Sequence, residues 1–339
     1  MRRQGERPIR ILIAPDKFKG SFDAATVAAA IADGIAAVAS DFEIEVTICP
    51  IADGGEGTAE ALLGAHGGRR VEAVASDPIG RPLLCSYAML DLEPMTAVVE
   101  VAEASGLWRL APDEYDPVGA DTRGTGQLIA AALSAGARRV LVACGGSATV
   151  DGGVGAVAEF DFAAEGAELI CLCDTRAAFL DAVELFAPQK GAGPAELVVL
   201  RERFGALVEG WPRDPSRLPF SGAAGGLAGG LWALRGATLR GGAATVLDAV
   251  GFDFALARSD LVVTGEGRLD SSSLSGKAVG EVAARARRAE VRCVAIVAQN
   301  RLAAASARAA GIASVREASN EAAIRAAAHD LIDLLAWSA

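Results

Sequence analysis

The sequence predicts an α/β protein with two α/β domains, one built on a parallel sheet and the other on a mixed or antiparallel sheet. First, runs that are apolar on both faces alternate with long alanine-rich segments, a pattern typical of parallel strands covered by helices on both sides. Second, three short strands separated by turn residues lie between residues 69 and 103, which favours an antiparallel meander. Third, 339 residues that are 52% hydrophobic can fill more than one core.

The elements follow in chain order. The strands expected in the parallel sheet are residues 10–14, 45–49, 139–143, 260–263 and 291–298, and the expected helices include 21–38, 56–64 and 128–135. The meander comprises RRVEAVA, LLCSYAML and TAVVEVA, separated by DPIGRP and DLEPM. We expect the parallel-sheet domain to comprise residues 1–68, 118–158 and 255–339, and the second domain to be inserted as residues 69–117 and 159–254.

The charge balance narrows the classes of partner. Lys and Arg number 32 against 43 Asp and Glu, a net charge of −11. Nucleic acids and anionic membranes attract basic surfaces, so neither is an expected partner. No apolar run reaches the roughly 18 to 20 residues that span a bilayer, and the N-terminus lacks the apolar stretch of a signal peptide. We expect a soluble, cytoplasmic protein that acts on a small molecule.

Cysteine and histidine contribute little to the expected chemistry. The six cysteines are scattered without zinc-type spacing, which favours reduced core thiols. The two histidines, His66 and His329, lie in a turn and in a helical pattern, so a catalytic Ser-His-Asp or Cys-His arrangement is not expected. Carboxylates, lysines, arginines and backbone N–H groups should therefore perform the chemistry.

Four loops of unusual composition follow four of the expected strands. They are APDKFKGS (14–21), ADGGEGT (52–58), GGSATVDGG (145–153) and TGEGRLD (264–270), the last leading to SGK (275–277). Ligands bind beyond the carboxyl ends of strands in open α/β sheets, so we expect these loops to build one site. Glycines allow backbone N–H groups to approach phosphate, lysines supply point charges, and carboxylates suit Mg²⁺.

Each loop has a structural alternative. Glycine pairs commonly make tight turns, and Asp151 could simply cap a helix. The segment 221–230, SGAAGGLAGG, could serve close packing between helices rather than a ligand. Two further segments are candidates: Arg123 at an expected helix N-terminus suits a carboxylate or phosphate, and Lys190 lies in the polar loop PQKG.

Known nucleotide fingerprints do not explain these loops. Gly276-Lys277 is followed by Ala278 rather than Ser or Thr, and Ser271 stands where a Walker A loop has its first glycine. No G-x-G-x-x-G opens the first expected helix.

The loops do match a family as an ordered set. APDKFKGS, ADGGEGT, EASGL (103–107), TRGTGQLI (122–129), GGSATVDGG, PQKGA (188–192), GAAGGL (222–227) and TGEGRLD with SGK run from Ala14 to Lys277. With these motifs the chain resembles the bacterial glycerate kinases, which generally phosphorylate D-glycerate at the 2-hydroxyl. Compared with that family, a stretch between Ala156 and Cys173 is shortened here, which could alter the substrate pocket or the oligomeric state.

The resemblance implies a fold and an activity. One domain would be Rossmann-like, the site would lie in the cleft between the domains, ATP and Mg²⁺ would be co-substrate and metal, and the protein would be a monomer or homodimer. The product would be 2-phosphoglycerate. Alternatives are a kinase for another small hydroxy acid or for the 3-hydroxyl of glycerate, and a non-catalytic paralogue that binds the ligand.

Family motifs and loop chemistry together give the expected roles. Asp151 is the expected base and Asp16 the alternative, with Lys19 and Asp270 as further catalytic residues. The substrate would contact Arg123, Lys190, Ser147 and Asp174. ATP and its phosphates would contact Lys17, Gly54, Gly55, Gly145, Gly146, Gly225, Gly226, Gly265, Ser273 and Lys277, and the metal would contact Asp53, Glu266 and Asp270.

Overall fold

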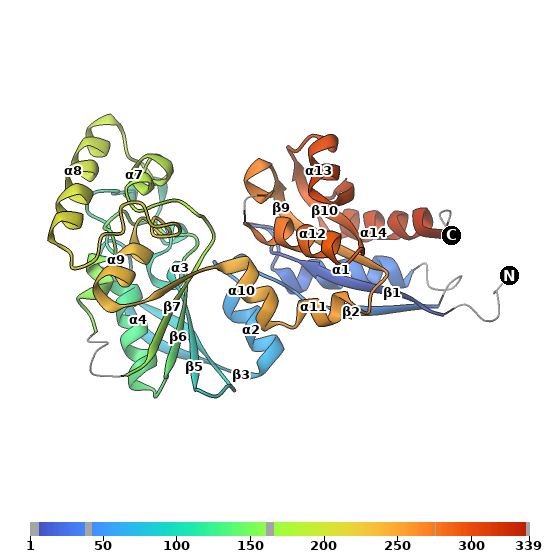
Figure 1. Ribbon diagram of the computed structural model, residues 1–339, viewed down its shortest axis with the longest axis horizontal. Coiled ribbons are helices and arrows are strands. Elements are labelled where there is room, and N and C mark those ends of the chain that lie inside the picture. The colour runs from blue at the N-terminus through green and yellow to red at the C-terminus, as the bar shows by residue number, and fades with distance from the viewer. Residues whose placement is uncertain (1–6, 38–42, 161–165, 275, 337–339) are drawn as a thin grey trace. The chain divides into compact units, whose positions relative to one another are not determined.

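The computed structural model (Figure 1) describes residues 7–37, 43–160, 166–274 and 276–336. The chain divides into two compact units. Unit 1 combines the residues up to Ala52 with those from Val246 onwards, and unit 2 is the continuous segment Asp53–Thr245. Each unit has its own sheet.

The described part of unit 1 contains a five-stranded parallel sheet in the order β11-β10-β9-β1-β2. Its strands are β1 (Ile9–Pro15), β2 (Ile44–Ile48), β9 (Leu261–Leu269), β10 (Arg292–Asn300) and β11 (Ile312–Glu317). Ile11 of β1 lies opposite Val46 on one side and Leu261 on the other, so the first strand occupies an inner position.

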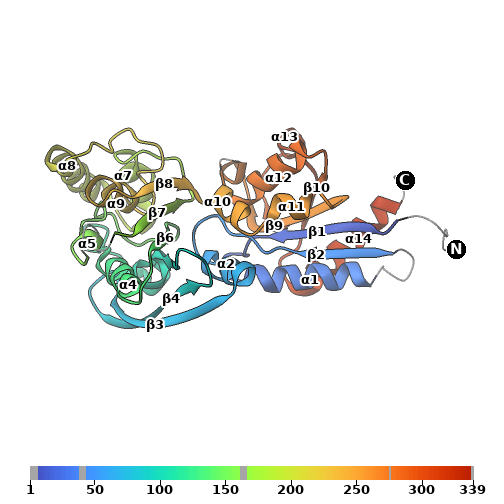
Figure 2. The ribbon, with the colours of Figure 1, turned by 60° about the horizontal axis from the view of Figure 1, so that its bottom comes forward.

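Helices cover both faces of this sheet (Figure 2). Side chains alternate along a strand, and Ile11 and Ile13 pack with the two helices α1 (Ala24–Ala36) and α14 (Glu321–Ala336). Leu12 and Ala14 pack on the opposite face, against the helices α10 (Gly242–Ala249), α11 (Phe252–Leu256), α12 (Ala278–Arg288) and α13 (Ala304–Ala310). This two-sided burial explains why the strands read as continuous apolar runs.

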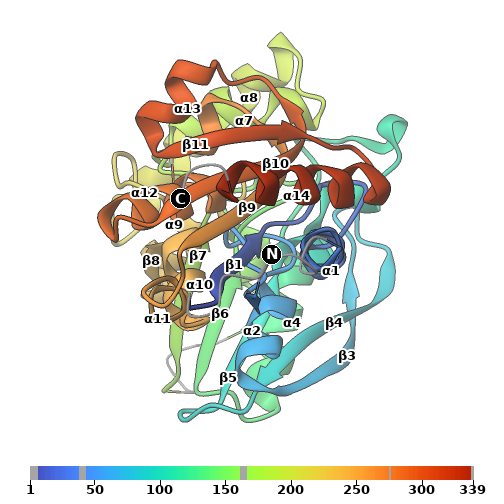
Figure 3. The same ribbon diagram turned by 90° about the vertical axis from the view of Figure 1, so that its right-hand side faces the viewer.

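In the described part of unit 2, six strands form a mixed sheet in the order β3-β4-β5-β6-β7-β8. They are β3 (Gly68–Ser76), β4 (Pro82–Leu90), β5 (Thr96–Glu100), β6 (Arg139–Ala143), β7 (Glu168–Cys173) and β8 (Thr238–Gly241). The pairs from β3 to β5 are antiparallel, and those from β5 to β8 are parallel. Figure 3 shows the long β3–β4 hairpin at the edge of this sheet.

The core of unit 2 lies between this sheet and the helices on one of its faces, where Val99 and Val142 meet Leu128 and Leu231. Among the described residues, the helices of the unit that precede α10 are α2 (Thr58–His66), α3 (Val101–Ser105), α4 (Arg123–Ser134), α5 (Val154–Val157), α7 (Asp181–Phe186), α8 (Pro194–Gly210) and α9 (Leu227–Arg235). Four short 3₁₀ turns of the described chain are η1 (Leu107–Arg109), η2 (Pro112–Glu114), η3 (Pro188–Lys190) and, in unit 1, η4 (Ser271–Leu274).

The predicted class is confirmed, since one sheet is parallel and the other is mixed, and the predicted meander corresponds to β3, β4 and β5. Two expectations within it were wrong. β6 pairs with β5 and β7 in unit 2, not with the parallel sheet of unit 1. TGEGRL is the second half of β9, because residues up to Leu269 pair with β10 as far as Asn300. An apolar run predicts a buried strand but does not identify its sheet.

The compact units also differ from the expected domain ranges. Residues 53–68 and 118–158 lie in unit 2, and residues 246–254 lie in unit 1. Across the described residues, no helix combines the length and the apolar character that crossing a bilayer requires. All six cysteines are described, and each is buried and free of a disulfide.

Candidate active site

In unit 2, the candidate site is at the carboxyl edge of the parallel strands. Because β5, β6 and β7 are parallel, the residues that follow them come to the same edge. β5 ends at the buried Glu100, β6 leads into Gly145, and β7 leads into Asp174. We call residues 145–153, GGSATVDGG, the glycine-rich loop.

The segment EASGL fixes the start of this loop. The Leu107 backbone N–H donates to the Gly146 carbonyl at 2.9 Å, and Ala148 N–H donates to the Ser105 carbonyl at 2.8 Å. These two bonds flank Ser147, so the backbone on both sides of its side chain is held. Ser147 is 7% exposed.

Asp151 fastens the end of the loop to the start of α4. Its Oδ2 accepts from the Thr122 N–H at 2.9 Å, the Thr122 hydroxyl at 2.7 Å and the Gly155 N–H at 3.1 Å, and Oδ1 accepts from the Gly153 N–H at 3.0 Å. The carboxylate is buried. Four donors from the chain itself therefore surround the residue expected to be the base.

Lys190, at the end of η3, binds the middle of the glycine-rich loop through its side chain. Its Nζ donates to Ser147 Oγ at 2.8 Å and to the Thr149 carbonyl at 2.7 Å. The side chain is 3% exposed. Burial lowers the pKa of this ammonium to about 7, against the opposing effect of the charges of Asp151 and Asp174. The ammonium that was expected to contact the substrate is thus buried and hydrogen-bonded within the protein.

GAAGGL packs against the same loop. A Cβ at Gly225 would lie 1.9 Å from the Thr149 carbonyl oxygen, and the Gly152 N–H donates to the Gly225 carbonyl at 3.1 Å. At Gly226, a Cβ would meet the Phe179 ring at 2.8 Å. The structural alternative thus accounts for Gly225 and Gly226, because protein atoms already fill the space that their missing side chains leave.

The ADGGEGT segment lies across the start of the glycine-rich loop. A Cβ at Gly55 would be 3.1 Å from the Gly145 Cα, so the two backbones are in contact. Asp53 Oδ1 accepts from the Gly55 N–H at 3.2 Å. Glu56 Oε1 would lie 2.6 Å from a Cβ at Gly146, and Asp174 Oδ2 would lie 3.7 Å from one at Gly145. Carboxylates thus surround the first two glycines of the loop.

Two other residues around this segment have structural tasks. Gly54 packs against Gly242, where an added Cβ would be 2.6 Å from the Gly242 Cα. Glu100, which the sequence analysis did not single out, accepts at 2.8 Å from the Ala59 N–H in the first turn of α2. A glutamate ending an apolar strand was the signal that could have identified it.

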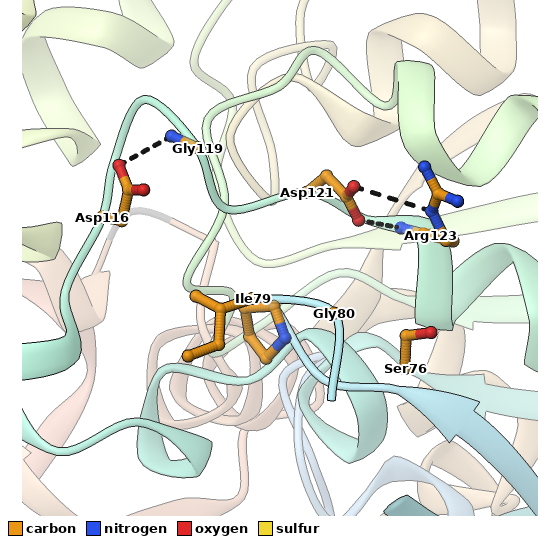
Figure 4. Close-up of a pocket in the computed structure, with 8 residues that line it drawn as sticks. Ser76, Ile79, Gly80, Asp116, Gly119, Asp121 and Arg123 are labelled. Carbon is orange, nitrogen blue, oxygen red and sulfur yellow. Dashed lines mark hydrogen bonds and ion pairs between the residues drawn. The ribbon is translucent and has the colours of Figure 1, made fainter. Parts of the chain in front are cut away.

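A pocket of about 320 Å³ opens at the same edge of unit 2 (Figure 4). β3 runs parallel to β5, so the turn after Ser76 reaches the carboxyl edge beside the N-terminus of α4. The pocket is lined by Ser76, Pro78, Ile79, Gly80, Asp116, Gly119, Asp121 and Arg123.

The pocket combines one cation with two carboxylates. The Arg123 side chain is 54% exposed, and its Nε lies 3.7 Å from Asp121 Oδ2 and 3.9 Å from Glu159 Oε1. Asp116 Oδ1 accepts from the Gly119 N–H at 2.7 Å, as Figure 4 shows. Neither Asp116 nor Asp121 was among the expected site residues, although Asp121 directly precedes the TRGTGQLI motif. Guanidinium and carboxylate together suit a ligand that has a carboxylate and hydroxyl groups.

Unit 1 brings a second set of predicted residues together at the carboxyl end of β1. The buried Asp16 donates its N–H to the Gly265 carbonyl of β9 at 2.8 Å. Its Oδ1 accepts from the Lys17 N–H at 2.7 Å and lies 3.8 Å from Lys17 Nζ. Gly267 of β9 lies against the same turn, since a Cβ there would be 3.0 Å from the backbone nitrogen of Lys19.

The neighbouring residues of β9 differ in role. A Cβ at Gly265 would lie 2.2 Å from the Ile296 carbonyl oxygen, so this glycine permits close strand pairing. Glu266 lies opposite Val297 in the β9–β10 ladder. Lys19 is exposed and Glu266 is half-buried.

Asp270 caps η4. Its Oδ1 accepts from the Ser272 N–H at 2.9 Å and the Ser272 hydroxyl at 2.5 Å, and Arg268 Nε lies 3.1 Å from Oδ2. The Ser272 hydroxyl is the main cause that lowers the pKa of Asp270, with the charges of Arg268 and Lys277 adding to it. Buried Ser273 accepts from the Asp270 N–H at 3.1 Å. Lys277 is the N-cap residue of α12, and Ser275 of the SGK motif lies outside the described residues.

The acidic side chains are compatible with Mg²⁺. Within the described ranges, no group of three or more His, Cys, Asp or Glu is placed to hold a metal ion. Mg²⁺ in kinases commonly takes one or two carboxylates and completes its shell with phosphate oxygens and water. Asp53 beside Gly55 and Glu266 in β9 supply such hard oxygen ligands, so the donor chemistry fits.

The comparisons with known proteins agree with one another. The model of the glycerate kinase family matches residues 11–168 and 157–336. The glycerate kinase of Bacillus subtilis (strain 168) is 36% identical, with 85% of this chain and 84% of that protein covered. The glycerate 2-kinase of Escherichia coli (strain K12) is 34% identical, with 79% and 80% covered.

A solved structure shows the same likeness. A glycerate kinase 2 from Salmonella typhimurium LT2 is 30% identical, and its match has a TM-score of 0.81 over 98% of this chain and 99% of that one. The two segments of the family match meet at residues 157–168, within the stretch expected to be shortened, of which residues 161–165 lie outside the described ones. By sequence and by structure, the chain belongs to the glycerate kinase family and is a kinase.

Proposed function

We propose that the chain transfers the γ-phosphoryl group of ATP to the 2-hydroxyl of D-glycerate and releases 2-phosphoglycerate. Membership of the glycerate kinase family supports phosphorylation of glycerate, and the relative from E. coli is named as a 2-kinase. The observation that carries the proposal is the convergence of EASGL, TRGTG, PQKGA and GAAGGL on the glycine-rich loop, beside a pocket that contains a guanidinium and two carboxylates.

D-glycerate fits the chemistry of the pocket in unit 2. Its carboxylate would bind the guanidinium of Arg123, and its hydroxyl groups would donate to Asp116 or Asp121. Of the two cationic residues expected to contact the substrate, Arg123 is the more suitable for binding the carboxylate. Its side chain is 54% exposed, whereas Lys190 is 3% exposed and donates to Ser147 and Thr149.

Lysine side chains of unit 1 would supply positive charge for the nucleotide. Lys17, Lys19 and Lys277 would neutralise phosphate oxygens. Asp53 and Glu266 would hold Mg²⁺, and Asp270, whose oxygens accept from Ser272 and lie beside Arg268, would hold one of its waters. When bound, Mg²⁺ would neutralise charge on the phosphates and orient them.

For the proton acceptor we propose Asp16 ahead of Asp151, the reverse of the order expected from the sequence. A base needs a lone pair directed at the substrate hydroxyl. Four donors from the chain surround the Asp151 carboxylate, and this arrangement suits a residue that organises the loop. Asp16 would take the proton while Lys17 keeps its carboxylate oriented.

Product analysis tests the function. Incubation with Mg·ATP and D-glycerate should release ADP and give a phosphorus NMR signal of 2-phosphoglycerate. A signal of 3-phosphoglycerate would overturn the regiochemistry, and turnover of a different hydroxy acid alone would overturn the substrate. Ligand binding without ADP release would identify a non-catalytic paralogue.

Two matched substitutions test the base. Asp16→Asn should lower kcat by about 10²- to 10⁴-fold in a protein that still unfolds cooperatively, because it removes the proton acceptor. Asp151→Asn should lower the free energy of unfolding by about 1 to 3 kcal/mol, because it disturbs a buried, fully bonded carboxylate. Kinetics and urea unfolding measure the two effects. The opposite result, with kcat lost in a fully stable Asp151→Asn protein, would restore Asp151 as the base.

A further inference from the structure

Lys190 is a buried cation with two acceptors on the glycine-rich loop. Its Nζ donates to Ser147 Oγ at 2.8 Å and to the Thr149 carbonyl at 2.7 Å. Burying an ammonium is unfavourable unless hydrogen bonds and charges compensate for it. Asp151 and Asp174 are the two carboxylates whose charges act on Lys190. The fold therefore keeps the amino group of Lys190, whose burial is unfavourable by itself, in contact with the part of the loop that contains Ser147.

The contact with Lys190 determines what the Ser147 hydroxyl can do. A hydroxyl that accepts from an ammonium keeps its own hydrogen for another acceptor. Among the described residues, the hydrogen bond of Ser147 Oγ is the one that it accepts from Lys190. The backbone bonds of Gly146 and Ala148 to the segment 105–107 hold the residue in place. Ser147 is thus a fixed hydroxyl donor whose oxygen is held by the amino group of Lys190.

We propose that Lys190 is a positioning residue for phosphoryl transfer, which fixes Ser147 Oγ so that the Ser147 hydroxyl donates to an oxygen of the transferred phosphoryl group. The proposal rests on the kinase function proposed above. It differs from the expectation that Lys190 binds substrate itself, because Lys190 here acts through Ser147.

The phosphoryl group is a better acceptor for Ser147 than the glycerate carboxylate. The carboxylate already has the exposed guanidinium of Arg123 in the pocket of unit 2. Negative charge on the transferred phosphoryl oxygens must be stabilised as the bond to ADP breaks, and preorganised donors are most effective there. A hydroxyl donor whose oxygen is held by the buried amino group of Lys190 is preorganised in this sense.

A double-mutant cycle in the full-length chain tests the proposal. Ser147→Ala and Lys190→Met should each lower kcat by about 10²-fold, the effect of losing one preorganised donor, with little change in the KM for D-glycerate. The double variant should be no slower than the slower single variant, because both substitutions remove the same donor. Ser147→Thr keeps the hydroxyl and should retain most of the activity, and Ser134→Ala on the exposed end of α4 is the matched control.

Binding measurements separate this proposal from the function on which it rests. Isothermal titration with 2-phosphoglycerate should show weaker binding for both single variants, whereas titration with D-glycerate, which lacks the phosphoryl group, should match the wild type. Multiplied losses in the double variant, or a raised KM for D-glycerate as the main effect of Lys190→Met, would overturn the proposal while wild-type turnover upholds the function. A wild-type protein that neither turns over nor binds these compounds would overturn both. Thermal unfolding checks that each variant is folded. If the Lys190→Met protein is not folded, the kinetics and binding of Ser147→Ala decide the test.

Discussion

Two buried groups of opposite charge, Asp151 and Lys190, hold the glycine-rich loop, and the chain satisfies them differently. Asp151 receives four hydrogen bonds, three of them from backbone N–H groups. Lys190 has two acceptors, which equals the number of hydrogens on a neutral amine. A neutral Lys190 would therefore be fully bonded, which agrees with the lowering of its pKa to about 7 by burial.

This lowered pKa predicts a pH dependence of stability. In the unfolded chain Lys190 titrates near its ordinary value of 10.5, so between pH 7 and 8.5 the unfolded state binds more protons than the folded state. Stability then rises with pH, by up to about 1.4 kcal/mol per pH unit. Lys190→Met removes this contribution. Across this pH range, the free energy of unfolding of the wild type should therefore rise relative to that of the variant.

Urea unfolding of both proteins from pH 6 to 8.5 measures the difference. Below pH 7 the lysine is protonated in both states, so the difference between the two proteins should be constant there. The upper limit avoids the buried thiols of Cys49 and Cys85, because burial raises the pKa of each to about 11 and they begin to oppose stability at higher pH. Parallel curves over the whole range would show that Lys190 stays charged in the fold.

At the scale of the elements, the glycine-rich motifs show what a sequence can and cannot predict. Their order identified the family, and their chemistry identified loops at strand ends, except for TGEGRL, which lies within β9. Packing could not be read from them. Gly225 meets the Thr149 carbonyl and Gly265 meets that of Ile296, so these glycines serve close backbone contact. By contrast, a Cβ at Gly20, Gly57 or Gly276 would meet nothing within 4 Å, and the positive φ of each explains why a glycine stands there.

The assignment of β6 shows a related limit. Its run RVLVA is apolar, and Val140 to Ala143 are buried. Buried apolar runs also form β1 and the first part of β9 in unit 1. Local hydrophobic pattern predicts that such a strand is buried, but the partner strand depends on contacts between residues distant in sequence. Thr122 and Glu100 were missed for the same reason, because their importance comes from the long-range partners Asp151 and Ala59.

At the scale of the whole molecule, unit 2 is a continuous insertion. The chain enters it at Asp53 and leaves it near Gly242, and these points touch, since a Cβ at Gly242 would lie 2.2 Å from the Asp53 carbonyl oxygen. Adjacent chain ends are typical of inserted domains that fold independently. The sequence predicted an insertion but placed its start at residue 69, because nothing local shows that α2 is capped by Glu100 of unit 2.

This architecture predicts that each unit folds alone and that neither is a kinase. Residues 53–245 contain a complete sheet, its core and the network of Lys190, Ser147 and Asp151. Expressed alone, they should unfold cooperatively in urea and keep the pH dependence contributed by Lys190. Unit 1 should fold when a short Gly-Ser linker joins Ala52 to Val246, because Ile51 and Leu247 share one core.

Neither piece should release ADP with D-glycerate, since Asp16 and Lys17 lie in unit 1 whereas Arg123 and Ser147 lie in unit 2. Circular dichroism, urea unfolding and a coupled ADP assay measure these outcomes, with the full chain as control. A non-cooperative transition for residues 53–245 would mean that the core of unit 2 depends on unit 1. Glycerate-dependent ADP release by that piece would show that the residues of unit 1 are not needed for the chemistry.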